Sequence, residues 1–423
     1  MVDILRSLLS DIAPDWLIAL IAYLIVAALL LTIAAVLTMA LVWIERRGVA
    51  RMQDRLGPNR VGPAGLLQLV ADGAKLFTKE DIVPAAADRW VHLLAPVVSL
   101  AAVGFTLAVV PWGRGLVPAD ISSAALFIAA VASVSGIGLM MAGWGSNNKF
   151  ALLGAMRAVA QVVSYEIPGV TALLGAVLLA GTMSLVSIAE QQAGLPIVGT
   201  SIPGAPDLGL GWYVFTPPGL VGFIIFYICV LAEGERTPFD IPEADSEIVA
   251  GYMTEYSGMK FALFYLGQYI LNFVLSMVAV VLFLGGWQGP GVAWLAAIPG
   301  WGEIAAALLS MVYMVGKAVL LIFVMVWIRG AFPRLRVDQL MGFAWKYLLP
   351  LALVNLASCA LWVAITQWSA AQWSGVLNLD ATEGWLRALL AFVLTAALNG
   401  AAYYWVLLVN QREEAEELAP EPV

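Results

Sequence analysis

Seven acidic side chains crowd residues 233–255 of this sequence, where a single arginine, Arg236, accompanies them. Carboxylates held close together raise one another's pKa, so such a cluster can take up protons near neutral pH. Part of the pattern has a plainer origin, because Asp240 with Glu243 resembles a capping box and the helix dipole favours acids at a helix start. Two prolines interrupt the stretch. The pattern predicts an acidic loop over 233–260 that forms the mouth of a proton route.

Two more ionisable residues, Glu166 and Lys317, lie within long apolar stretches. A charged side chain inside a membrane costs roughly 2.5–3.5 kcal/mol on insertion scales, so a paired or functional role is the default. Pro168, close behind Glu166, removes a helix hydrogen bond and can open the backbone to a wet cavity. Lys317 could instead be an uncharged lysine kept for packing. We predict a proton-path or charge-pair role for both, with each the candidate partner of the other.

A third constellation is arginine-rich and spans residues 45–60. Retention of positive charge on the cytoplasmic side of a membrane explains its five arginines. It does not explain the two turn signals, Gly57-Pro58-Asn59 and Gly62-Pro63, which fix a particular path into the next helix. A fixed path predicts a binding site or a docking surface here.

The rest of the sequence must position these residues within a membrane. Hydrophobic residues make up 62% of the 423 and charged residues only 12%, against about 25% in soluble proteins. Spanning a bilayer takes roughly 20 helical residues. The sequence therefore predicts an all-α polytopic protein, one integral membrane domain over 1–423, with nine spans at 16–44, 90–112, 121–144, 158–183, 212–232, 261–287, 304–328, 346–368 and 386–409.

Charge distribution predicts which side of the membrane each loop faces. Lysine and arginine concentrate in the loops after the odd-numbered spans, which places those loops in the cytoplasm. The N-terminus then faces outward and the C-terminus inward. Within the cytoplasmic arginine-rich loop 45–89, residues 63–77 have the periodicity of an amphipathic helix lying on the membrane surface. The acidic end, 410–423, is expected to be a solvated cytoplasmic tail.

Composition also argues against several classes of site. The net charge of −8 does not suggest nucleic-acid binding. Cys229, Cys359 and His92 are too few to ligate an iron–sulfur cluster or a bis-histidine haem, and we expect no metal site. Any redox centre that works with this chain is therefore expected on another chain.

The three constellations together resemble a known family, the H subunit of bacterial NADH:quinone oxidoreductase (complex I), the counterpart of mitochondrial NADH dehydrogenase subunit 1. The resemblance covers the first eight spans. It rests on Glu45–Arg60, on Asp72-Gly73-Ala74-Lys75, on Arg157 with Gln161 and Ser164-Tyr165-Glu166, on Ala232–Asp240, on Glu255-Tyr256, on Lys317, and on Trp327-Ile328-Arg329 with Phe332-Pro333-Arg334 and Asp338-Gln339-Leu340.

The resemblance implies a subunit of the bacterial inner membrane that forms much of a quinone tunnel and the charged path coupling quinone reduction to proton translocation. Its expected partners are quinone, membrane lipid, the peripheral-arm subunits and the small and antiporter-like membrane subunits. FMN and Fe–S clusters are expected on those partners and none on this chain. The resemblance assigns quinone binding to Arg46, Arg55, Phe239 and Asp240; a proton path to Glu166, Glu233, Glu243, Asp245, Glu247 and Lys317; and structural or interface charges to Asp72, Lys75, Arg236, Glu255, Arg329 and Arg334.

The sequence differs from the family pattern at two points, and two other functions remain as alternatives. Gln268 stands where relatives often have a glutamate, so a relay through that point must use water or another acid. The ninth span exceeds the family's common eight. A free-standing ion transporter is one alternative, although we find no internal repeat of the kind such folds often have. The membrane subunit of a membrane-bound hydrogenase is the other, and the full arginine-rich loop favours the quinone enzyme over it.

Overall fold

The computed structural model of the protein describes residues 14–194, 209–242, 248–299, 301–367 and 384–417. Regular structure within these ranges is helical, as the sequence predicts. The longer helices are α2 (Asp15–Met52), α4 (Arg89–Val109), α5 (Ala124–Gly145), α6 (Lys149–Ala180), α8 (Pro217–Glu233), α10 (Gly258–Phe283), α12 (Gly302–Ala331), α14 (Leu349–Gln367) and α16 (Gly384–Glu417). The shorter elements are η1 (Pro63–Gly65), α3 (Gln68–Thr78), α7 (Leu185–Gln191), η2 (Tyr213–Phe215), η3 (Gly251–Met253), α11 (Val292–Ala296), α13 (Val337–Gly342) and the π-helical turn η4 (Phe343–Leu348).

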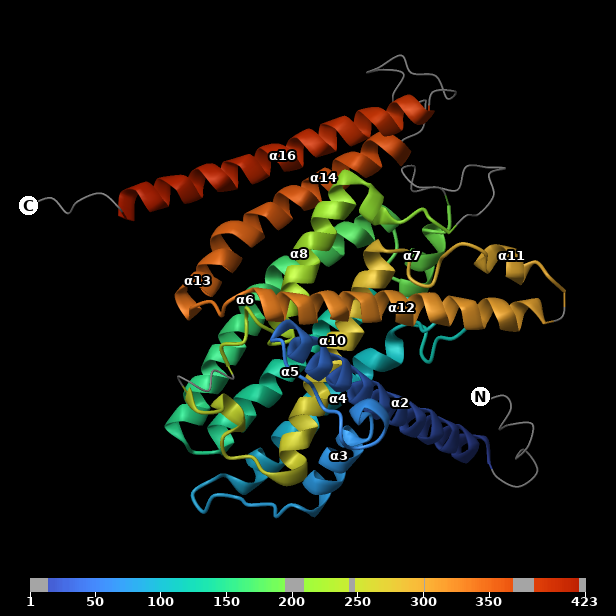
Figure 1. Ribbon diagram of the computed structural model, residues 1–423. Helices are drawn as coiled ribbons and strands as arrows, with labels where there is room; N and C mark the ends of the chain where they lie inside the picture. The colour runs from blue at the N-terminus through green and yellow to red at the C-terminus, as the bar shows by residue number, and fades with distance from the viewer. Residues whose placement is uncertain (1–13, 195–208, 243–247, 300, 368–383, 418–423) are drawn as a thin grey trace, which may run out of the picture.

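Each of the nine predicted spans corresponds to an apolar helix. In the described part of the chain, eight helical segments are long and apolar enough to cross a membrane, counting α13, η4 and α14 as one. The ninth is α8, an apolar helix of 17 residues. In Figure 1, α2 begins at the side where α11 lies, and α16 ends at the opposite side, where α13 lies. Several apolar helices of this length make the chain a multi-pass membrane protein. An odd number of crossings agrees with the first and last helices ending at opposite sides of the bundle.

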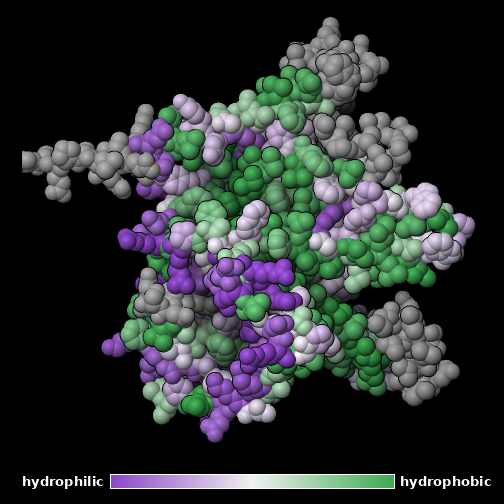
Figure 2. All heavy atoms as spheres, in the orientation of Figure 1, coloured by the Kyte–Doolittle hydropathy of each residue, from purple (hydrophilic) through white to green (hydrophobic). Residues whose placement is uncertain are grey.

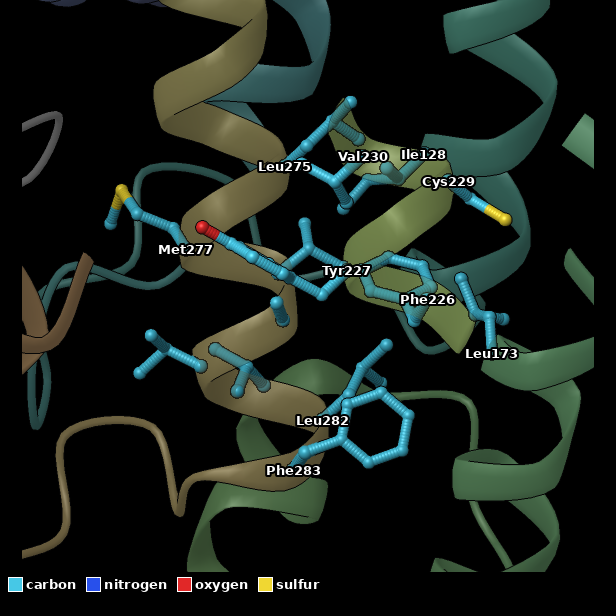
Figure 3. Packing of buried hydrophobic residues seen from close by; sticks show 14 of the residues in the cluster. Ile128, Leu173, Phe226, Tyr227, Cys229, Val230, Leu275, Met277, Leu282 and Phe283 are labelled. Atoms are coloured by element: carbon cyan, nitrogen blue, oxygen red, sulfur yellow. The ribbon is translucent and has the colours of Figure 1, made fainter. Parts of the chain in front are cut away.

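The helix α10 forms the centre of the bundle. It contacts α2, α4, α6, α8 and α12, and nearly every side chain in its second half is buried. Figure 3 shows α10 packed against α8, with Tyr227 of α8 pointing toward Met277 of α10, and the rings of Phe226 and Phe283 have their centroids 6.0 Å apart. In a bilayer, van der Waals packing of this kind holds helices together, because lipid tails are as apolar as the side chains themselves.

Two helices extend further toward the predicted cytoplasmic side than the hydropathy pattern indicates. The first, α2, continues through the predicted loop to Met52, and its 38 residues rise about 57 Å, far more than a hydrocarbon core of about 30 Å. Arginine is a good helix former, so the charges that end the apolar run do not end the helix. The other, α6, begins at Lys149 rather than 158, where Asn148 caps it by accepting a hydrogen bond from the Phe150 N–H at 2.9 Å.

Of the predicted amphipathic helix over 63–77, only residues 68–77 form a regular helix, within α3; residues 63–65 form the separate turn η1, in which Ala64 has a φ of 56°. In α3, the polar residue Asp72 is partly buried and faces the bundle, while Val70 and Phe77 are exposed. A helix resting in the surface of a bilayer has this arrangement, since its apolar face then lies in lipid.

A close approach between α6 and the turn η3 yields a prediction about packing. A Cβ added at Gly154 of α6 would lie 2.6 Å from the Gly251 Cα, so the backbone of η3 would have to move. We expect Gly154→Ala to destabilise the protein by about 1–3 kcal/mol, the usual cost of overpacking. The melting temperature of the purified protein in detergent measures this.

The matched control is Gly104→Ala in α4, where no atom outside the helix lies within 4 Å of the added Cβ. Because alanine favours a helix over glycine, this variant should be neutral or slightly stabilised. Equal melting temperatures for the two variants would contradict the packing described here.

Candidate functional site

A large cavity opens where the arginine-rich and acidic segments meet. Its volume is about 1120 Å³, and its walls come from α2, the turn after it, α3, the segment after α8, α10 and the end of α12. Figure 2 shows hydrophilic residues over the C-terminal end of α2 and over α3, beside apolar helices. The lining includes Thr38, Val42, Glu45, Arg46, Arg55, Leu69, Asp72, Leu76, Glu235, Arg236, Asp240, Phe261, Tyr265, Gln268, Tyr269 and Arg329. The cavity therefore combines apolar walls with several fixed charges.

One carboxylate, that of Glu45, joins two arginines in the wall of this cavity. Arg236 donates to both of its oxygens at 3.1 Å, and Arg329 pairs with it as well. Glu45 is only 7% exposed, so the pairs are largely shielded from water, where charge-assisted hydrogen bonds are strong. The Arg236 guanidinium also lies 4.1 Å from the centroid of the Tyr269 ring, a cation–π contact with α10. Three segments distant in sequence are thereby held together with a net charge of +1.

A second ion pair, between Arg46 and Asp72, connects α2 to α3 across the cavity at 2.7 Å. Burial raises the pKa of Asp72, but hydrogen bonds from Arg46 and Gln68, helped by the charge of Lys75, bring it below the ordinary value of a carboxyl. Asp72 therefore stays ionised at neutral pH and keeps Arg46 in place. Arg46 itself is half exposed, so its remaining donors face the cavity and solvent.

Three of the four predicted quinone-binding residues, Arg46, Arg55 and Asp240, line the cavity. Arg55 is exposed there and donates to the Gln53 side chain at 2.7 Å. Asp240 pairs with Arg334 at 3.2 Å. The fourth residue, Phe239, is not in the lining. It is buried against Tyr165, with ring centroids 5.2 Å apart.

Glu235 is a further acid in the lining, and the sequence-based assignment omitted it. Its side chain is 5% exposed and accepts hydrogen bonds from the Tyr252 hydroxyl at 2.9 Å and from the Gln268 amide at 3.2 Å. Gln268, where the resemblance leads us to expect a glutamate, therefore stands beside an acid. The sequence held one signal for this residue: a glutamine at 268 requires another acid nearby if protons pass this point, and Glu235 is such an acid.

A second, smaller cavity lies inside the bundle and is lined by both Glu166 and Glu233. Its volume is about 30 Å³, enough for a water molecule. The Ser133 hydroxyl hydrogen-bonds the Glu166 carboxylate from the neighbouring helix α5. Because α6 begins at Lys149 rather than at the predicted residue 158, Glu166 lies near the middle of the helix. Two predicted proton-path residues thus face one space.

Lys317 is not the partner of Glu166, and that part of the prediction is wrong. Its ammonium group donates to the carbonyls of Leu284, Gly286 and Gln288 at 2.7, 3.0 and 2.8 Å, and it lies 4.2 Å from the Trp212 ring. These carbonyls follow the end of α10, where unpaired carbonyls and the negative end of the helix dipole attract a cation. An ammonium group has three donors, and all three are occupied.

The remaining predicted residues are placed as follows. Glu255 accepts a hydrogen bond from the Asn148 amide at 2.6 Å, next to the start of α6. Lys75 is exposed on α3, where its charge acts on Asp72. Three residues of the predicted proton path lie outside the described residues, namely Glu243, Asp245 and Glu247.

Comparison with known proteins bears on what this arrangement is for. A sequence profile of the NADH dehydrogenase family matches residues 24–360, which include both cavities. The chain belongs to the NADH dehydrogenase family. The match ends within α14, so α16 lies beyond the part shared with the family.

Curated relatives agree with the family assignment. The H subunit of NADH-quinone oxidoreductase from Anaeromyxobacter dehalogenans is 42% identical over 352 residues, which cover 81% of this chain and 82% of the relative. NADH-quinone oxidoreductase subunit 8 of Rhodothermus marinus is 44% identical over 354 residues, 83% of this chain and 98% of the relative. The H subunit of the same enzyme from Thermomicrobium roseum is 44% identical over 355 residues, 81% of this chain and 96% of the relative. Family members of this kind are subunits of an oxidoreductase, as the resemblance implies.

The position of Glu45 leads to a prediction about stability. Glu45→Ala leaves Arg236 and Arg329 facing each other without a counter-charge, and breaking such a buried pair costs about 3 kcal/mol or more. We expect a loss of about 3 kcal/mol in the free energy of unfolding and no more, because Arg329 is 38% exposed and solvent therefore screens its charge. The purified protein should melt at a lower temperature.

The control is Asp72→Ala, which removes a pair whose arginine is 47% exposed and should cost no more than about 1 kcal/mol. A Glu45→Ala variant as stable as Asp72→Ala would show that the buried carboxylate does not hold the three segments together.

Proposed function

We propose that this chain is the membrane subunit of a proton-translocating NADH:quinone oxidoreductase in which the large cavity receives quinone. The observation that carries the proposal is the lining of that cavity, where apolar side chains stand beside four arginines and four carboxylates. A quinone has an apolar tail and two carbonyl oxygens that gain negative charge on reduction. Arginines fixed in advance would stabilise that charge without reorganising during the reaction.

We propose that the electrons come from other chains. Cys229, Cys359 and His92 are buried in apolar surroundings, and in the described part of the chain no cluster of ligands could hold a metal ion. We propose that FMN and Fe–S clusters lie on the peripheral-arm subunits, as the names of the relatives suggest for a multi-subunit enzyme. This chain would supply the walls, the charges and the access from lipid.

We further propose that protons and charge pass from the large cavity to the small one. Glu235 lines the first cavity, Glu233 lines the second, and Gly234 separates them in sequence. Reduction of quinone to quinol adds two electrons and two protons, so the site carries extra negative charge only until the protons arrive, and Glu235 stands beside that transient charge. Carboxylates that share a site respond to such a change by exchanging protons. Glu166, in the same small cavity as Glu233, is the next group inward.

The orientation follows from the same arrangement. We propose that the large cavity lies at the cytoplasmic side of the bacterial inner membrane, with the C-terminal end of α16 on that side and the start of α2 on the other. The excess of arginine and lysine around the cavity supports this orientation.

The role of the cavity is tested with Arg55→Ala. Loss of this cation should lower quinone reduction by roughly tenfold, the equivalent of about 1.4 kcal/mol, while oxidation of NADH by an artificial acceptor stays unchanged. Both rates are measured on the purified complex. Arg60→Ala, an exposed arginine outside the cavity lining, is the matched control. Equal loss of both activities would indicate failed assembly, and full quinone reduction would remove Arg55 from the site.

The proton route is tested with Glu233→Gln, which keeps the shape of the side chain but removes its ionisable group. We expect fewer protons translocated per NADH in sealed vesicles, with quinone reduction in the presence of an uncoupler less affected. Glu190→Gln, exposed on α7, is the control. A variant that pumps as the unmodified enzyme does would exclude Glu233 from the route.

A further inference from the structure

Two buried side-chain amides hold the backbone that joins the two cavities. The last carbonyls of a helix have no donors within it, and side chains can supply them. At the end of α8, Gln161 of α6 donates to the carbonyls of Ala232 and Phe239 at 2.8 and 2.7 Å. Asn272 of α10 donates to the Gly234 carbonyl at 3.1 Å. These amides are only 2% and 4% exposed, so the segment after α8 is fixed from two different helices.

Of the two amides, Asn272 is the one that contacts the residue between the two acids. Glu233 lines the small cavity and Glu235 lines the large one, with Gly234 between them. The Asn272 nitrogen also donates to the Gln268 carbonyl at 2.9 Å, one turn back along α10. Because both carbonyls can only accept hydrogen bonds, the nitrogen must face them, which fixes the orientation of the amide. Asn272 therefore ties Gly234 to the central helix of the bundle.

The same contact explains why position 234 is a glycine. Its φ of −79° is one that any residue adopts, so the backbone conformation does not require glycine. A Cβ added there would overlap the Asn272 amide oxygen. Glycine at 234 thus permits the close approach of the amide to the backbone.

Stability alone does not account for an asparagine at position 272. Its amide oxygen is buried and accepts no hydrogen bond from the part of the chain that the structure describes. A buried acceptor without a donor is unfavourable, and the neighbours of Asn272 along α10 are mostly apolar. What the asparagine adds over an apolar residue is the hydrogen bond to Gly234.

We propose that Asn272 is a positioning residue for proton transfer between the two cavities, because it fixes Gly234 and with it the directions of the Glu233 and Glu235 side chains. This inference rests on the proposed function, in which protons and charge pass between those acids. Proton transfer requires the two groups, or a water that joins them, to be correctly placed, and a small displacement lowers the rate by a large factor. Without the amide, the backbone between the acids is free to rotate, and both carboxylates lose their placement together.

The test is Asn272→Leu, which fills nearly the same space but cannot donate to Gly234. In sealed vesicles that contain the purified complex, we expect protons translocated per NADH to fall roughly twofold or more. Quinone reduction in the presence of an uncoupler and NADH oxidation by an artificial acceptor, both expressed per bound flavin, should stay unchanged, because Asn272 is absent from the lining of the large cavity. A residue that only stabilises the fold would lower all three rates together.

The matched control is Ser276→Ala, one turn further along α10. This side chain is also buried and polar, but its hydroxyl donates to the Asn272 carbonyl at 2.7 Å and not to the segment after α8. Protons per NADH should therefore equal those of the unmodified complex.

A second pair of variants tests the contact itself. Gly234→Ala places a methyl group against the Asn272 amide and should lower the melting temperature of the complex. Adding Asn272→Ala makes room for the methyl group, so the double variant should melt higher than Gly234→Ala while its proton translocation stays low.

Three results would overturn the inference: normal proton translocation by Asn272→Leu, an equal loss of all three activities, or a double variant that melts no higher than Gly234→Ala. Normal translocation by Glu233→Gln would instead refute the proposed proton route itself, so the two failures are distinguishable.

Discussion

The carboxylate of Glu45 is the contact on which the arrangement around the large cavity depends. It joins the end of α2 to Arg236, after α8, and to Arg329, near the end of α12. A carboxylate this well shielded must be compensated, because an unpaired charge in such surroundings costs several kcal/mol. The three segments are therefore constrained to meet, and the walls of the cavity follow from their meeting.

The buried helix α10 complements this polar contact from inside the bundle. Its apolar second half fills the space between the surrounding helices, and its first half presents Gln268 and Tyr269 to the cavity. Lys317 binds the carbonyls that follow its C-terminal end, and Lys260 near its start pairs with Asp81 at 2.8 Å, so both ends of α10 are held by polar contacts. A rigid central helix allows the loops at its ends to keep a fixed geometry even though they contain few regular hydrogen bonds.

The spans and the two charged segments could be predicted because each is a local property of the sequence. An apolar run longer than a bilayer is thick rarely forms anything but a membrane span, and a concentration of acids or arginines is visible in the sequence. The role of Glu45 could not be predicted this way, since its two partners lie 191 and 284 residues further along the chain. Nor could the environment of Lys317, because its acceptors are backbone carbonyls, which every residue has. The opposite orientations of Phe239 and Asp240 depend on loop dihedral angles, on which hydropathy carries no information.

Only one residue separates Glu233 from Glu235, so the spacing of these two acids does not depend on which subunits surround the chain. Two residues of backbone span at most about 7 Å, so covalent geometry limits the separation between the Cα atoms of Glu233 and Glu235, each of which lines one cavity. Gly234 is held there as well, since its carbonyl accepts a hydrogen bond from the Asn272 amide at 3.1 Å. Exchange of neighbouring subunits cannot alter that separation. Under the proposed function, this chain is a module whose two acids keep their spacing whichever electron donor is attached on one side and whichever proton-translocating machinery on the other.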